Sequence, residues 1–144
     1  MTKSNNNSKT VVIKDVELNW AFLTKSHAPF GQEIWDVQVK TTDQAIVDQM
    51  KDAGVNMKEK DGAFVANVKR KVMNAKGERN NPPQLIDSEG NAMDNNPGNG
   101  SKGNVKLFSY EYNVGGRSGR AAMLSAVRVT DLVEYNATTE ELDF

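Results

Sequence analysis

The chain has 144 residues, of which 38% are hydrophobic and 26% are charged. A chain near this length buries about two-thirds of its unfolded surface around one core, and no run approaches the roughly 18 apolar residues of a membrane-spanning helix. With no cysteine and one histidine, disulfides, thiolate zinc sites and cysteine nucleophiles are excluded, and histidine-based triads are disfavoured. We therefore expect a single domain that is not an enzyme and binds no membrane.

The net charge of −1 hides an uneven distribution along the chain. Residues 62–130 contain ten Lys and Arg against five Asp and Glu, whereas the charged side chains of residues 136–144 are all acidic. A basic middle section and an acidic end predict an anionic partner, and an end of the chain that the basic section attracts.

The first half of the chain predicts two strands. Residues 1–10 are polar, and we expect a disordered leader. Residues 11–22 alternate, which predicts a strand whose buried side carries Val12, Val16, Leu18, Trp20 and Phe22. After a turn at 29–31, residues 34–41 predict a second strand with Trp35, Val37 and Val39 on its buried side. Both tryptophans are thus expected in the core.

A short helix and a basic strand are expected next. Thr41 and Gln44 have the spacing of a capping box, and the helical pattern after them ends at Gly54. Residues 63–73 predict a third strand, whose solvent side carries Lys69 and Lys71.

The second half contains a long irregular segment and two further strands. Residues 74–104 include eight Asn, five Gly and three Pro, so we expect a mostly mobile segment in which residues 82–87 dock in extended form. Strands are predicted at residues 105–113 and 121–135, joined by a glycine-rich turn. Five strands and one helix indicate a small antiparallel barrel.

The strand at residues 105–113 carries the pattern most informative about function. Its period-two positions are Lys106, Phe108, Tyr110 and Tyr112. Aromatic rings beside cations are the surface on which single-stranded nucleic acids stack their bases without sequence preference. The alternative is that these rings line the core while Val105 and Leu107 face outward.

Cations near this strand are candidates for contacts to phosphates. Arg117 and Arg120 lie in the glycine-rich turn, and Lys69 and Lys71 form a second cationic line, so that the two pairs could flank a groove. Arg70 is a further candidate, although it falls in the apolar phase of its strand. The alternative is an ordinary solvated turn and strand face.

Two other motifs in the sequence give little information about function. The run from Gly98 to Gly103 matches G-x-G-x-x-G but lacks the preceding strand and following helix of a dinucleotide site. Asp87 and Glu89 could suggest a metal-dependent nuclease, but the position expected for its lysine is Asn91, so we interpret both as turn residues. We predict no metal site and no cofactor.

The acidic end closes with two apolar side chains set among carboxylates. A tail that only kept the protein soluble would not need a terminal phenylalanine, so we interpret it as a short motif for a partner protein. The motif consists of Glu140, Glu141, Leu142, Asp143 and Phe144.

Several of these motifs together resemble the OB-fold single-stranded DNA-binding proteins of tailed bacteriophages. The resemblance is loose over residues 11–135 and closer over 98–135. It rests on Val-Val-Ile-Lys-Asp-Val-Glu-Leu near the start, Pro82-Pro83-x-x-x-Asp87, Gly98-Asn99-Gly100-Ser101, Gly103-Asn-Val-Lys-x-x-x-Tyr110, and Leu124-x-Ala126-Val-x-Val129-x-Asp131-Leu-Val-Glu-Tyr135.

This resemblance implies a five-stranded OB-type barrel over residues 11–135, followed by a disordered acidic tail at 136–144. It also implies a protein, often a homodimer, that coats and protects single strands in phage DNA replication and recombination, in the cytoplasm of the infected bacterium. The tail would then recruit replication proteins such as a polymerase or helicase-primase, although three acidic side chains are few for the class. The alternative function is a non-catalytic phage structural or adaptor module that binds another protein through its basic face.

Overall fold

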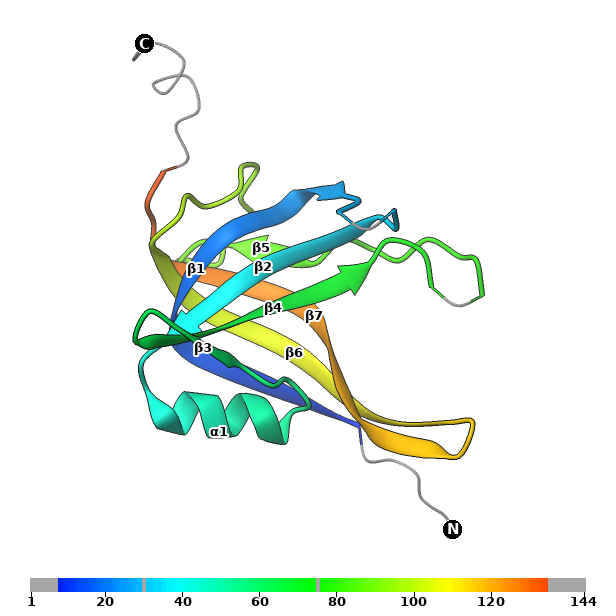
Figure 1. The fold of residues 1–144 in the computed structure, drawn as a ribbon. Coiled ribbons are helices and arrows are strands. Elements are labelled where there is room, and N and C mark those ends of the chain that lie inside the picture. Colours follow the sequence, from blue (N-terminus) through cyan, green and yellow to red (C-terminus); the bar gives the residue numbers. More distant parts are fainter. Residues whose placement is uncertain (1–7, 30, 75, 135–144) are drawn as a thin grey trace.

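The structure is a computed structural model and describes residues 8–29, 31–74 and 76–134. Figure 1 shows a curved sheet with one helix at its lower edge. The elements in chain order are β1 (Lys9–His27), β2 (Ile34–Thr41), α1 (Gln44–Asp52), β3 (Lys58–Lys60), β4 (Ala63–Lys71), β5 (Gln84–Ile86), β6 (Ser101–Val114) and β7 (Arg117–Asp131). Lys9 and Thr10, expected in the leader, are the first residues of β1.

The strands form one sheet in the order β3-β4-β2-β1-β6-β7-β5, which curls until β4 lies beside β7 (Figure 1). The five expected strands and the helix are present as an OB-type barrel, and β3 and β5 are short additions. β5 pairs with β7 in parallel at the edge of the sheet, whereas the pairs among the five expected strands are antiparallel as predicted. Inside lies an apolar core made of Ile13, Val16, Leu18, Leu23, Val37, Val39, Met50, Val68, Leu85, Val105, Leu107, Leu124, Val127 and Val129.

β1 changes its buried side along its length. Its pairing register shifts between Ile13 and Val16, and again between Asn19 and Phe22. Each irregularity exchanges the two faces of a strand, so Val12 and Phe22, which were expected to be buried, are exposed. Trp20 was also expected in the core and is instead 66% exposed, whereas Trp35 is buried as expected.

Helix α1 is capped at its N-terminus by Asp43 and not by Thr41. Asp43 is the N-cap and its carboxylate accepts the N–H of Ala45, while Thr41 Oγ1 accepts the N–H of Asp43. The predicted capping box between Thr41 and Gln44 was therefore wrong, because Thr41 lies two residues too early. The predicted end was right: Gly54 follows with φ +103. No helix in the described ranges is long and apolar enough to span a membrane.

The segment between β4 and β6 is fastened to the barrel, contrary to the expected mobility. Asn96 Oδ1 accepts the N–H groups of Leu23 and Thr24 at 2.8 and 3.0 Å, and Asn99 Oδ1 accepts that of Trp20 at 2.8 Å. The expected docking of residues 82–87 is confirmed, because β5 pairs with β7 and Leu85 is buried. The asparagines of this segment thus satisfy the backbone of β1 where its own ladder is interrupted.

Candidate nucleic-acid interface

The outer side of β6 carries a row of exposed aromatic side chains. Phe108, Tyr110 and Tyr112 are 38%, 36% and 43% exposed, while Val105, Leu107 and Ser109, which belong to the opposite phase of the strand, are buried. The alternative that the rings line the core is therefore wrong. We call the outer side of β6 from Lys106 to Tyr112 the aromatic face.

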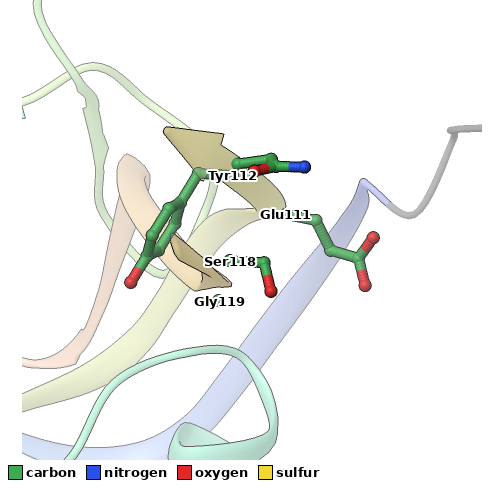
Figure 2. Close-up of a pocket in the computed structure, with 5 residues that line it drawn as sticks. Glu111, Tyr112, Ser118 and Gly119 are labelled. Atoms are coloured by element: carbon green, nitrogen blue, oxygen red, sulfur yellow. The ribbon is translucent and has the colours of Figure 1, made fainter. Parts of the chain in front are cut away.

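The rings of this face are arranged as a platform. Phe108 and Tyr110 stack with ring centroids 6.0 Å apart and planes inclined by 25°. Figure 2 shows Tyr112 and Glu111 leaving β6 on opposite sides, next to Ser118 and Gly119 of β7. The ring of Tyr112 lies over Gly119, where a Cβ atom would come within 2.6 Å of the tyrosine hydroxyl. Gly119 therefore leaves room for the ring to lie along the sheet.

Two of the predicted cations stand at the two ends of the aromatic face. Lys106 is exposed and stands at its start, opposite Val12 of β1. Arg117 is exposed and pairs with Val114, which places it in the same phase as Tyr112 at the end of the β6–β7 hairpin. A positive side chain therefore stands at each end of the row of rings.

Arg120 points to the inner side of the hairpin instead. Its guanidinium donates to Ser109 Oγ at 3.0 Å and lies 3.8 Å from the carboxylate of Glu111. Ser109 in turn donates to the carbonyl of Ala53 at the end of α1. Arg120 thus connects β7 to the C-terminal end of the helix, where a positive charge is favourable.

Arg70 is also occupied by the protein itself. Its Nε donates to the carbonyl of Asn81 at 2.7 Å, and its Nη1 lies 3.5 Å from the carbonyl of Leu124. The side chain therefore bridges β4, the following segment and β7 at the closure of the barrel, as its position in the apolar phase indicates.

Lys69 and Lys71 occupy a different surface from the aromatic face. Both are exposed on the outer side of β4, and β2 and β1 separate that strand from β6 in the sheet. Lys69 lines a crevice of about 540 Å³ together with Ala121 and Ala122 of β7. Neither arginine lines this crevice, since Arg117 stands beyond Tyr112 at the end of the hairpin and Arg120 turns inward.

The structure also reveals an aromatic residue that the sequence analysis had placed in the core. Trp20 stands at the irregularity of β1 with φ +52, a left-handed conformation that costs a non-glycine residue roughly 1–2 kcal/mol. It lines a crevice of about 280 Å³ with Gln38, Lys40 and Lys60. No glycine marks this irregularity, so the period-two pattern of the sequence gave no sign of it.

The acidic turn at Asp87 has a structural role. The Asp87 carboxylate accepts the N–H groups of Asn91 and Glu89, each at 2.9 Å. The hydrogen bond from Asn91 is the main cause that lowers the pKa of Asp87 below its usual value. Within the part of the chain that the structure describes, no three His, Cys, Asp or Glu side chains gather as a metal site would require.

The comparisons with known proteins concern the fold. No protein-family model and no curated protein matches the sequence. Among solved structures, gp2.5, a single-stranded DNA-binding protein encoded by bacteriophage T7, superposes with a TM-score of 0.60 at 18% identity, with 89% of each chain covered. The single-stranded DNA-binding protein of bacteriophage Enc34, in complex with ssDNA, superposes with the same TM-score at 12% identity, covering 92% of this chain and 95% of that one.

The chain has the OB fold of bacteriophage single-stranded DNA-binding proteins. The resemblance found in the sequence is thereby confirmed at the level of the fold. The proposed partner-binding tail, Glu140–Phe144, lies outside the described residues.

Proposed function

We propose that the protein binds single-stranded DNA without sequence preference and without catalysis. The observation that carries the proposal is the row of three exposed rings on β6, with Lys106 and Arg117 at its ends. Apolar side chains that are exposed next to one another, rather than singly, mark an interaction surface. Every nucleobase offers a flat face for stacking, so such a row accepts any sequence.

The roles of the side chains follow from their positions. Phe108, Tyr110 and Tyr112 stack bases, and Lys106 and Arg117 hold the phosphates on either side. Arg70 and Arg120 were predicted to contact DNA, but their partners within the protein make them supports of the barrel and the hairpin. We therefore leave both out of the proposed interface.

Titration with oligo-dT tests this function. We expect binding to single strands and far weaker binding to duplex of the same length, because paired bases are already stacked and cannot lie on Phe108 or Tyr110. Two phosphate contacts, from Lys106 and Arg117, predict a salt slope of about −1.4, since each contributes about −0.7; affinity then falls about sevenfold between 50 and 200 mM salt. Equal affinity for duplex would make the aromatic face irrelevant, and absence of binding at low salt would favour the adaptor module.

We further propose a role in phage DNA replication and recombination, in the cytoplasm of the infected bacterium. The similarity of the fold to two phage proteins that bind single-stranded DNA supports this proposal. On the same resemblance we propose a homodimer, for which sedimentation of the full chain is the measurement. A monomer at micromolar concentration would contradict it.

The acidic tail is proposed to recruit replication proteins such as a polymerase or helicase-primase. Its carboxylates also imitate a run of phosphates, and attachment through a short tether gives an effective concentration of about millimolar. We therefore expect that deleting residues 136–144 tightens DNA binding severalfold at low salt, and that salt reduces the gain.

Phe144→Ala tests the proposed binding of partner proteins by the tail more directly than the deletion does. It is expected to leave DNA affinity nearly unchanged, because it removes no charge, and to weaken capture of replication proteins from infected cells. The wild-type chain serves as the control in the same pull-down. Capture that is indifferent to Phe144 would reduce the tail to a solubilising appendage.

A further inference from the structure

Trp20 is the most exposed large hydrophobic side chain among the described residues, at 66%. Its backbone has φ +52, a conformation that is rare for a bulky residue and is found where the surrounding structure enforces it. Neither the exposure nor the backbone conformation benefits the stability of the fold. A strained, exposed aromatic residue of this kind calls for a role outside the core.

Hydrogen bonds to the segment before β6 hold the backbone at Trp20 in place. Asn99 Oδ1 accepts the backbone N–H of Trp20 at 2.8 Å, and Asn19 Oδ1 accepts the N–H of Gly100 at 2.9 Å. The two asparagines thus join β1 and the segment before β6 reciprocally. The indole therefore projects from a fixed backbone.

The crevice beside the indole suits an uncharged, flat group. Lys40 and Lys60 line it, but so do Glu17 and Asp61, and Lys40 lies 4.0 Å from the Glu17 carboxylate. The local charge is therefore balanced, which disfavours a phosphate in the crevice. Gln38 adds an amide that can both donate and accept hydrogen bonds, as the edge of a nucleobase requires.

Cationic side chains suited to binding phosphates lie further along the same surface. Val65 lines the crevice, and Asn67, Lys69 and Lys71 follow it in the same phase of β4. The six residue steps from Val65 to Lys71 span about 20 Å at about 3.4 Å each, a length that several nucleotides cover. In Figure 1, β1, β2 and β4 lie side by side and form this surface.

We propose that Trp20 stacks a base of single-stranded DNA on this second face, while Lys69 and Lys71 hold the adjoining phosphates. The proposal rests on the proposed function, but it concerns strands other than β6. It also assigns a role to Lys69 and Lys71, which lie outside the aromatic face. The protein then contacts DNA on two surfaces, with β1 between them in the sheet.

Two variants with a single tryptophan test the proposal directly. Trp35→Phe leaves only the exposed Trp20 as a fluorophore, and Trp20→Phe leaves only Trp35, which is 3% exposed. On titration with oligo-dT we expect strong quenching in the first variant and little in the second. If Trp35→Phe fails to fold, the difference in quenching between the wild type and Trp20→Phe gives the same information.

Affinity provides an independent measurement. Trp20→Ala is expected to weaken oligo-dT binding about tenfold, as the loss of one stacked base does, and Trp20→Phe to restore most of the loss. Trp20→Gly is expected to bind as weakly as Trp20→Ala yet melt no lower than the wild type, because glycine accepts φ +52 without strain. A structural role for the indole predicts a lower melting temperature instead.

The two proposals fail in different ways. If the wild type binds oligo-dT while Trp20→Ala binds equally well and Trp20 is not quenched, the site at Trp20 is refuted and the proposed function stands. If the wild type does not bind oligo-dT at low salt, the proposed function fails, and the site at Trp20 fails with it.

Discussion

Replacing Phe108 and Tyr110 together by alanine is expected to weaken binding to oligo-dT by about 2–6 kcal/mol, because each stacked base contributes about 1–3 kcal/mol. The lower figure already corresponds to a loss of about thirtyfold in affinity. Since both rings lie on the outer side of β6, the melting temperature is expected to change little. Fluorescence anisotropy of a labelled oligonucleotide and thermal unfolding measure the two quantities separately.

Two further variants make this result specific. Val12→Ala removes an exposed apolar side chain from the position paired with Lys106, and we expect DNA affinity to stay nearly unchanged because no ring is lost. Leu107→Ala changes a fully buried residue next to Phe108, and is expected to cost about 2–5 kcal/mol of stability. A Phe108 and Tyr110 double variant that melts early but binds normally would contradict the stacking role.

The aromatic face could be predicted from the sequence because β6 keeps one phase. From Ser101 to Ser109 its odd-numbered residues are buried, without interruption. Lys106, Phe108 and Tyr110 therefore shared a side that the alternating pattern could identify. The same reasoning placed Lys69 outward and Arg70 inward on β4.

Trp20 could not be predicted in the same way, because its exposure depends on contacts distant in sequence. The irregularities of β1 reverse its faces, and the backbone at Trp20 is held by Asn99, 79 residues away. From its composition alone, an asparagine-rich segment predicts only turns and loops. That its side chains replace missing ladder hydrogen bonds of another strand is visible only in three dimensions.

The inward position of Arg120 illustrates a second limit. A glycine-rich turn with two arginines is typical of an exposed basic loop, and Arg117 conforms to it. The two residues differ because they lie on opposite sides of β7, and only the inner side faces Ser109 and the end of α1. The assignment needed the register of the hairpin, which a turn of uncertain length does not fix.

Gly103 belongs to the motif on which the resemblance in the sequence rested, and the structure supplies its physical reason. β6 and β7 change register next to it, between Lys102 and Gly103. A Cβ atom at this position would collide with the carbonyl oxygen of Arg128 and lie 3.1 Å from the Cα atom of Val129. Both are backbone atoms of the neighbouring strand, so neither can move aside without distorting the sheet.

Gly103→Ala is therefore expected to destabilise the barrel by about 3 kcal/mol, the upper end of the usual cost of overpacking a tight site, and to lower the melting temperature by roughly 10 °C. Gly116→Ala is the contrasting variant: it has φ +81 but nothing within 4 Å of the added atom, so its loss of roughly 1–2 kcal/mol measures a conformational cost that Gly103, whose φ is not positive, does not carry. Urea unfolding of the three proteins measures the difference. A Gly103→Ala protein as stable as the wild type would mean that the close approach of β6 to β7 contributes nothing, whereas a loss larger than that of Gly116→Ala identifies the crossing that holds the aromatic strand in register.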